Sequence, residues 1–508
     1  MSNSSPPIDE GGSLAFLGRS ATLSILFGAE AVASFLLDVV IAAVFGLSAQ
    51  SDALYAAYGL PQKVGRGMFQ SLTNSFMGLF AGEEDRRRAY DEAITVIAVL
   101  AVPVSVLLSL TSAWWLPVTI PGAPAETRIA AVPLAAVLAW LLAFLALAET
   151  FRAIYYHEGV MWLPTVTRIA GIALSTAFVL AAPVGQRLTL AAWGLALGAA
   201  LEAALGLALL PAVLKVRYRL TWPDAARLRT TLAMVGVPLM SQGTYVAATL
   251  GEQALVSLLP SGSITAANYA RRIMNTLERF AFRGFLITTI RESAERKRVD
   301  VRSDFRQVML VALPVAAVIG VLYVPLTAVL FGRGKFGAQD VQTLAVALQM
   351  FALAVLGEAA TRIPSGLAYA KRQLRVLFMS AVFSSATLVA SEAVLIWAGL
   401  GLRALGLGTT LAGAVSFAWL YFAVLHREGV VMADRRSALQ LIVVGASAWL
   451  GAALFQALGR AAFGGSAPDV VLLGGGMAGC GVFLAGAAYA LGLGEVRRAL
   501  GILRGAHR

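Results

Sequence analysis

The chain has 508 residues, of which 58% are hydrophobic and 13% are charged, and its mean hydropathy is +0.77. Soluble domains carry about 25% charged residues, so this composition excludes a soluble fold and favours a membrane protein. The net charge of +12 does not indicate nucleic-acid binding, because no soluble segment longer than a short loop is available to carry a basic face.

Fourteen apolar segments follow one another along the chain, each long enough to cross a bilayer as a helix. They cover residues 20–47, 52–81, 90–116, 129–156, 160–182, 189–214, 230–259, 264–290, 307–331, 340–370, 376–398, 403–425, 438–460 and 469–493. The polar N-terminus lacks the basic region of a signal peptide, so we expect the first segment to be retained. The fold class that follows is all-α and polytopic, with 14 transmembrane helices.

The basic residues of the connecting loops alternate in number along the chain. One set of alternate loops, with both chain ends, holds 25 Lys and Arg, whereas the opposite loops hold six. Basic residues collect on the cytoplasmic side of bacterial membranes. The asymmetry therefore predicts an even number of spans with the N- and C-termini in the cytoplasm, although the loop at 155–162 contains no basic residue and is assigned by parity alone.

Nine Lys and Arg residues remain within the apolar segments, where a charge is costly unless it faces water or a partner. They are Lys63, Arg66, Arg152, Arg168, Arg271, Arg272, Arg279, Arg283 and Arg362. For some of them the spacing favours structural pairing along one helix face, namely Arg152 with Glu149 and Arg362 with Glu358. For Arg168, near the end of a span, we expect the side chain to snorkel toward the interface.

The remaining cations have a spacing typical of a binding surface. Arg272, Arg279 and Arg283 lie on one stripe of the eighth segment. Lys63 and Arg66 lie three residues apart in a second segment that is rich in polar residues. Because Arg grips phosphate with two donors, we expect these five cations to line an aqueous cavity and to bind a phosphate or diphosphate. Purely structural pairing is the alternative.

A weak internal repeat links the two halves of the chain. The stretch from Ser48 to Tyr58 is similar to the stretch from Gly262 to Arg272. At the same offset Asp38 corresponds to Glu252, and Glu149 and Glu358 occupy similar places in the fourth and tenth segments. This duplication favours a carrier with two six-helix lobes, in which the substrate lies between the repeats.

Three stretches carry a resemblance to a known family. They are Phe45-Gly-Leu-Ser-Ala-Gln-Ser-Asp-Ala-Leu-Tyr-Ala-Ala-Tyr-Gly-Leu-Pro61, Ser261-Gly-Ser-Ile-Thr-Ala-Ala-Asn-Tyr-Ala-Arg-Arg-Ile-Met274, and Leu313-Pro-Val through Pro325-Leu-Thr to Leu330-Phe-Gly-Arg-Gly-Lys-Phe336. In order and spacing the chain resembles the MurJ (MviN) lipid II flippases, within the superfamily of multidrug, oligosaccharidyl-lipid and polysaccharide exporters. The resemblance implies two pseudo-symmetric six-helix lobes around a cationic cavity, and a last helix pair that forms a groove for the polyprenyl tail.

The chain departs from the family pattern on its N-terminal side. Family members usually carry arginines around the aspartate equivalent to Asp38, but this chain has Ala31 and Leu37 there. The usual Arg-Arg and Glu-Gly of the second segment are replaced by Gly65-Arg66-Gly67 and Gln70-Ser71. These departures leave flipping as the expected activity and put the identity of the lipid-linked substrate in question.

The resemblance and the charge pattern together predict a flippase in the bacterial inner membrane, with lipid II as the expected substrate. We expect Arg272, Arg279, Arg283, Arg66 and Lys63 to bind the diphosphate and sugar, and Asp38, Asp52, Glu252, Glu358 and Arg362 to shape or gate the cavity. The expected parts are a cytoplasmic N-terminus (1–19), lobes at 20–229 and 230–437, a helix pair at 438–493 and a basic cytoplasmic tail at 494–508.

Other functions stay open at this point. A flippase for another lipid-linked oligosaccharide and a cation-coupled multidrug antiporter are the alternatives, as is a scaffold without transport activity. No catalytic arrangement of Ser, His, Cys or paired carboxylates stands out, so we expect neither an enzyme nor a metal or cofactor. The coupling ion is not indicated by the sequence.

Overall fold

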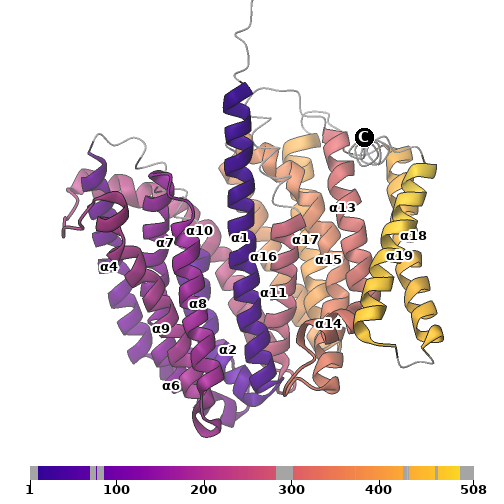
Figure 1. Cartoon of the computed structure of the whole chain (residues 1–508), viewed down its shortest axis with the longest axis horizontal. Coiled ribbons are helices and arrows are strands. Elements are labelled where there is room, and N and C mark those ends of the chain that lie inside the picture. Colours follow the sequence, from indigo (N-terminus) through magenta and orange to yellow (C-terminus); the bar gives the residue numbers. More distant parts are fainter. Residues whose placement is uncertain are drawn as a thin grey trace, which may run out of the picture. The chain divides into compact units, whose positions relative to one another are not determined.

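The computed structural model describes residues 10–68, 76, 80, 85–281, 301–371, 373–426, 432, 434–463 and 467–491, with backbone alone at 10–25, 27, 67–68, 230–239, 241 and 278–281. This described part is helical and contains no strand. Its elements (Figure 1) are α1 (Glu10–Phe45), α2 (Ala49–Gln62), η1 (Lys63–Met68), α4 (Arg86–Leu110), α5 (Ser112–Thr119), α6 (Ala125–Leu138), α7 (Leu141–His157), α8 (Leu163–Ala181), η2 (Val184–Gln186), α9 (Arg187–Ala208), η3 (Leu210–Leu214), α10 (Ala225–Val256), α11 (Ser263–Ala281), α13 (Val301–Val321), α14 (Tyr323–Phe331), α15 (Ala338–Ala370), α16 (Leu374–Trp397), α17 (Arg403–Leu420), η4 (Tyr421–Leu425), α18 (Arg435–Ala462) and α19 (Asp469–Ala490).

Eleven helical segments of the described part are long and apolar enough to cross a membrane. They coincide with eleven of the fourteen expected spans, so the all-helical, multi-pass membrane fold is confirmed. The other three expected spans, at 52–81, 230–259 and 264–290, each include residues or side chains outside the described part. The count of fourteen therefore stays a prediction.

The chain divides into two compact units that interleave along the sequence. Unit 1 contains Met1–Val40, Pro61–Thr111 and Ala136–Leu239, and unit 2 contains Ile41–Leu60, Ser112–Ala135 and Met240–Arg508. Both α1 and α10 therefore contribute to each unit. The predicted domain boundaries after residues 229 and 437 stay predictions.

Unit 1 is organised around α7, which packs against η1, α4 and α9. Its core includes the fully buried aromatic side chains of Phe80, Tyr90 and Tyr155. The Tyr155 hydroxyl donates a hydrogen bond of 2.8 Å to the carbonyl oxygen of Gly206 in α9. Because a buried hydroxyl needs a partner, this bond fixes the level at which α7 and α9 meet.

Unit 2 is organised around α15, which packs against α11, α13, α14 and α17. The last two helices, α18 and α19, pack together and against α13. A Cβ atom on Gly451 would lie 2.4 Å from the carbonyl oxygen of Gly479, and one on Gly479 would lie 2.5 Å from that of Gly451. These two glycines thus permit the close contact between α18 and α19, as small residues do in membrane helix pairs.

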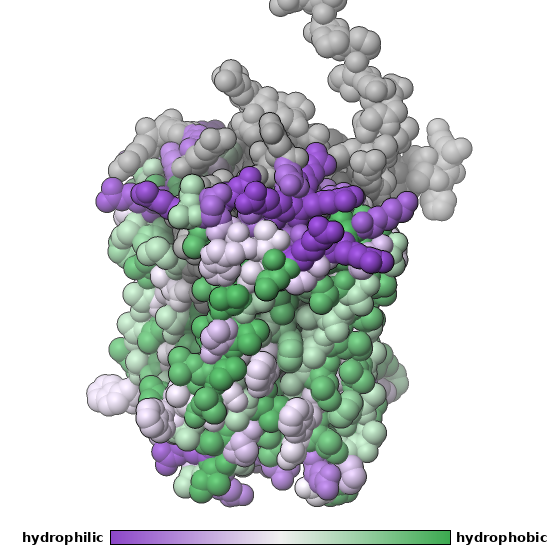
Figure 2. All heavy atoms as spheres, turned by 90° about the vertical axis from the view of Figure 1, so that its left-hand side faces the viewer, coloured by the Kyte–Doolittle hydropathy of each residue, from purple (hydrophilic) through white to green (hydrophobic). Residues whose placement is uncertain are grey.

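The surface of the helices is largely apolar between its two ends. Figure 2 shows hydrophilic residues in a broad band at one end of the displayed face, a largely hydrophobic region below it, and fewer hydrophilic residues at the other end. Large apolar side chains on α4, such as Leu107 and Leu110, are 60% and 80% exposed. A soluble protein rarely exposes so large an apolar surface, so this region is suited to contact with lipid.

Candidate functional site

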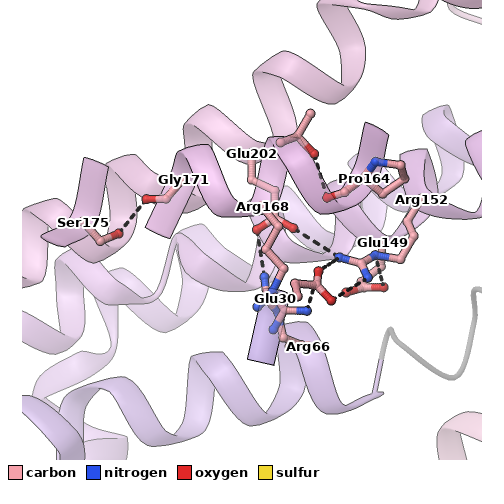
Figure 3. Close-up of polar contacts among 10 residues, drawn as sticks. Glu30, Arg66, Glu149, Arg152, Pro164, Arg168, Gly171, Ser175 and Glu202 are labelled. Atoms are coloured by element: carbon pink, nitrogen blue, oxygen red, sulfur yellow. Dashed lines mark hydrogen bonds and ion pairs between the residues drawn. The ribbon is translucent and has the colours of Figure 1, made fainter. Parts of the chain in front are cut away.

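Six ionisable side chains meet in the interior of unit 1 (Figure 3). They are Glu30 of α1, Arg66 of η1, Glu149 and Arg152 of α7, Arg168 of α8 and Glu202 of α9. Arg66 exposes 17% of its side chain, and each of the other five exposes less than a tenth. We call these six residues the unit 1 charge cluster.

Glu30 and Arg152 form the centre of the cluster. Arg152 donates from Nη2 to Oε1 of Glu30 at 2.7 Å and from Nη1 to Oε2 at 3.4 Å. The same carboxylate lies 2.9 Å from Nη1 of Arg168. Arg152 also reaches Glu149, one turn before it on α7, with 3.4 Å between Nε and Oε2. One carboxylate on α1 is thus shared by guanidinium groups on α7 and α8.

Glu202 connects the third arginine to this centre. Nη2 of Arg66 donates to Oε2 of Glu202 at 2.8 Å. The other oxygen of Glu202 lies 3.7 Å from Nη2 of Arg152. The cluster is therefore continuous from η1 through α9 and α7 to α8 and α1, as the dashed lines in Figure 3 show.

Three arginines and three glutamates give the cluster no net formal charge. A single buried charge in a membrane protein is costly, whereas a balanced and hydrogen-bonded group can be accommodated. Loss of any one member leaves an uncompensated charge in a region from which water is largely excluded. The balance therefore makes the cluster a fixed feature of unit 1 rather than an open anion site.

Small residues bring α8 and α9 close enough to place Arg168 and Glu202 in the same cluster. A Cβ atom on Gly198 would lie 2.1 Å from Oγ of Ser175 and 2.4 Å from the carbonyl oxygen of Gly171. The Ser175 hydroxyl lies 3.0 Å from the carbonyl oxygens of Gly171 and Gly194. Only glycine fits at position 198 without moving these backbones apart.

A π-helical turn presents Arg66 to the cluster. The turn η1 follows Pro61, whose ring cannot donate the usual helical hydrogen bond. A Cβ atom on Gly65 would lie 3.0 Å from Cα of Leu142 in α7. Gly65 thus lets η1 lie against α7, and the next residue, Arg66, reaches Glu202.

A smaller cluster lies within unit 2. Nε of Arg271 on α11 donates to Glu252 of α10 at 2.6 Å, and its Nη2 donates to Glu392 of α16 at 3.4 Å. The guanidinium carbon lies 5.6 Å from the ring centre of Phe351, a cation–π distance. Glu392 is completely buried. Two carboxylates here share one arginine, so this cluster is not cationic.

Asp52 caps the helix that carries Arg271. Its carboxylate accepts hydrogen bonds from the backbone N–H of Gly262 at 2.6 Å and of Thr265 at 2.8 Å, and from the Thr265 hydroxyl at 2.7 Å. Gly262 has a φ of +93°, a conformation that favours glycine. Asp52 satisfies N–H groups that the first turn of α11 leaves without helical partners. It therefore determines where α11 begins.

The five predicted phosphate-binding cations have different surroundings. Arg66 is engaged by Glu202 in the unit 1 charge cluster. Lys63 on η1 and Arg272 on α11 are partly exposed. The side chain of Arg279 and the whole of Arg283 lie outside the described residues. Of the three arginines in the predicted stripe, the structure describes the side chain of Arg272 alone. The role of the stripe in binding stays a prediction.

The residues predicted to shape or gate the cavity are mostly paired or buried. Asp38 on α1 is buried, and Glu252 is paired with Arg271. Nη2 of Arg362 lies 2.7 Å from Oε2 of Glu358 on the same face of α15. The gating role of these residues and of Asp52 stays a prediction.

The structure confirms two pairings expected from helical spacing and corrects a third expectation. Arg152 pairs with Glu149 and Arg362 pairs with Glu358, as predicted. The prediction that Arg168 snorkels is wrong, because this residue is 5% exposed and pairs with Glu30. The carboxylate of Glu30, 2.9 Å from Nη1 of Arg168, holds this side chain inside unit 1.

Ion-pair partners that lie on different helices could not be identified from the sequence. Glu30, Glu202 and Glu392 lie within apolar segments of the sequence, but nothing in a single sequence pairs them with Arg66, Arg168 or Arg271 across 121 to 138 residues. The only indication in the sequence was that these acids and arginines lie at similar depths within their predicted spans. The part of the chain described by the structure contains no group of three or more His, Cys, Asp or Glu that could hold a metal ion.

Comparisons with known proteins agree with this architecture. The family model described as lipid II flippase MurJ matches residues 41–463. A probable lipid II flippase MurJ of Bdellovibrio bacteriovorus is 28% identical over 272 residues, which is 50% of each chain. One of Vibrio cholerae is 25% identical over 243 residues, 45% of each chain. The chain thus spans about half the length of these curated relatives in the alignments.

Solved structures share the fold at low sequence identity. A lipid II flippase MurJ in an inward closed conformation has a TM-score of 0.76 at 16% identity, covering 93% of this chain and 99% of the other. An inward-facing multidrug resistance MATE family transporter has a TM-score of 0.64 at 17% identity, covering 77% and 93%. Because the family model matches most of the sequence, the chain belongs to the MurJ lipid II flippase family.

Proposed function

We propose that this protein is a flippase that moves lipid II, a polyprenyl-diphosphate-linked saccharide, from the inner to the outer leaflet of the bacterial cytoplasmic membrane. The match of the family model to residues 41–463 carries this proposal. The printed names of the Bdellovibrio and Vibrio relatives support it, although their alignments span only about half of those proteins. In the proposed mechanism the substrate site opens to the two leaflets in turn, and the chain acts as a transporter, not as an enzyme.

The diphosphate is the part of the substrate that demands charge. We assign its binding to Lys63 and Arg272, which are both partly exposed. Arg279 and Arg283, which lie on the same sequence stripe as Arg272, belong to the same assignment. Arg66 contributes only when Glu202 releases it. Guanidinium groups suit a diphosphate because they donate two hydrogen bonds in parallel.

The apolar tail of the substrate needs a surface continuous with lipid. We assign it to α18 and α19, the helix pair at the end of the described chain (Figure 1). Exposed apolar side chains cover both helices, among them Ile442 and Leu450 on α18 and Val470 and Val482 on α19. A polyprenyl chain on this surface would remain in a hydrocarbon environment while the head group crosses.

The topology and the energy source belong to the same proposal. The asymmetry of basic loops supports cytoplasmic N- and C-termini. Movement of an anionic head group toward the outer leaflet is favoured by the usual membrane potential, negative inside, so no coupling ion is required by electrostatics alone.

The test is a flipping assay with the full chain reconstituted in vesicles that contain fluorescent lipid II. A membrane-impermeant reductant quenches the label in the outer leaflet, and transport makes the remaining label accessible. We expect Arg272→Ala to reduce the rate by at least about tenfold, because it removes a charged partner of the diphosphate. Arg272→Lys should retain part of the activity.

Arg403→Ala is the matched control, because Arg403 is an exposed arginine at the start of α17. Its rate should equal that of the unmodified protein. Transport of lipid II that is insensitive to Arg272→Ala contradicts the assigned binding site. Absence of lipid II transport by the unmodified protein, with transport of another polyprenyl-diphosphate saccharide, contradicts the substrate and supports the alternative raised by Ala31 and Leu37.

A multidrug antiporter is the second candidate, favoured by the shared fold with the MATE transporter. That activity requires a site for organic cations, and the positive charge of the residues assigned here opposes it. Efflux of a cationic dye by the reconstituted protein, without movement of lipid II, would decide for the antiporter.

A further inference from the structure

The segment that joins η3 to α10 has no regular secondary structure, yet it is fastened to α4. The backbone N–H of Arg219 donates to Oδ1 of Asp91 at 3.1 Å, and that of Thr221 donates to Oγ1 of Thr95 at 3.3 Å. The Tyr218 hydroxyl lies 2.9 Å from the same Thr95 oxygen. Asp91 and Thr95 are buried, so the attachment points lie within unit 1.

The fastened segment, residues 215–222, is called the strap below. From Lys215 to Arg219 its side chains alternate between solvent and the interior. Val216 is buried and Tyr218 packs against the core of unit 1. The exposed residues between and beside them are Lys215, Arg217 and Arg219. Lys215 ends η3 with a left-handed backbone (φ +56°). All three cations are exposed, whereas Val216 between the first two is buried, so the cations share the outward side of the strap.

The first turn of α4 adds further positive charge at the same end of unit 1. Arg86 and Arg87 are exposed there, whereas Arg88 pairs with Glu92 at 2.7 Å. Glu92 also lies 3.5 Å from Arg227 of α10. The nearby carboxylate of Asp91 is turned inward to the strap backbone. Among the described residues, the strap cations and these two arginines form no ion pair.

Apolar side chains accompany these cations. Leu220 and Trp222 of the strap are 82% and 56% exposed, and Trp162, in the loop between α7 and α8, is 51% exposed. This loop lies at the same end, because Glu158 within it accepts a hydrogen bond from Tyr90 of α4. Exposed tryptophan beside basic residues is typical of the boundary between hydrocarbon and head groups. A soluble anion would not require these apolar groups.

We propose that the strap and the first turn of α4 form a binding site for the head groups of anionic phospholipids in the adjoining leaflet. The strap holds its cations on a backbone that is already fastened, so little conformational freedom is lost when phosphates bind. Basic residues next to a membrane attract anionic lipids, and Leu220 and Trp222 enter the interface beside them. This site is separate from the proposed transport of lipid II and uses none of the residues assigned to it.

The experiment places the full-length protein in vesicles that contain either brominated phosphatidylglycerol or brominated phosphatidylcholine at equal mole fraction. Bromine quenches nearby tryptophan, and the signal of Trp222 is the difference between the protein and its Trp222→Phe variant. We expect quenching by the anionic lipid to exceed that by the zwitterionic lipid by at least about twofold. The combined variant Lys215→Gln/Arg217→Gln/Arg219→Gln should remove this excess.

The control variant is Lys335→Gln/Arg403→Gln/Arg460→Gln, which removes three exposed cations from other parts of the chain and has the same net charge as the strap variant. It should keep the excess quenching. Equal quenching by both lipids in the unmodified protein, or equal loss in both variants, overturns the proposal. Loss of the excess on addition of inorganic phosphate at constant ionic strength also overturns it, because the site would then bind phosphate without the lipid.

Discussion

Replacement of Glu30 by glutamine is the most direct test of the charge cluster in unit 1. Glu30 is 5% exposed and accepts from Arg152 at 2.7 Å and from Arg168 at 2.9 Å. Glutamine keeps the size of the side chain and one acceptor oxygen, but it removes the negative charge that two guanidinium groups share. The cluster then has one uncompensated positive charge.

The expected loss of stability follows from this imbalance. Breaking a buried ion pair by removing one partner costs about 3–5 kcal/mol, because the other charge stays buried. Since glutamine still accepts a hydrogen bond, we expect the lower end, about 3 kcal/mol. For a unit of this size each kcal/mol lowers the midpoint by roughly 2–4 °C, so the expected shift is roughly 6–12 °C.

The assay is thermal unfolding of the purified full-length protein in detergent, monitored by tryptophan fluorescence. The double variant Glu30→Gln/Arg168→Gln restores the charge balance and should recover part of the loss, since residues in one network are not additive. Arg88→Gln removes the exposed partner of an ion pair of similar length, and Glu92 still has Arg227 at 3.5 Å, so the midpoint should change little. If Glu30→Gln and Arg88→Gln have the same midpoint, or if the double variant is additive, the reasoning is refuted.

Further substitutions test other parts of the structure, the first three of them by the same measurement. Asp52→Ala removes the N-terminal cap of α11 and should cost about 1–2 kcal/mol of stability. Gly198→Ala places a methyl group 2.4 Å from a backbone oxygen of α8 and should cost about 1–3 kcal/mol, whereas Gly474→Ala, with no atom within 4 Å of the added Cβ, should be neutral. Glu392→Gln should be tolerated because Glu252 still neutralises Arg271, but Arg271→Gln, which leaves two buried carboxylates, should reduce the yield of folded protein in size-exclusion chromatography.

The fold was predictable because the bilayer simplifies it. Hydrocarbon permits only internally bonded segments, so apolar length alone located eleven of the helices that the structure describes. Pairings along one helix were also predictable, as Arg152 with Glu149 and Arg362 with Glu358 show, because a fixed helical repeat determines which side chains are neighbours.

Contacts between helices were not predictable in the same way. The pairing of Arg66 with Glu202 depends on a π-helical turn and on the absence of a side chain at Gly65. The burial of Arg168 depends on how closely α8 approaches α9 at Gly198. Each is a consequence of packing distance, and a single sequence contains no measure of that distance.

The charge of the two described clusters limits where a diphosphate can bind. The unit 1 charge cluster is balanced, and the cluster around Arg271 has one cation for two carboxylates. Neither supplies the excess positive charge that an anionic head group requires. If the proposed function is correct, that excess must come from Lys63, Arg272 and the cations that follow Arg272 on the sequence stripe. Neutralising Arg272 should therefore affect transport more than stability, whereas neutralising Glu30 should do the reverse.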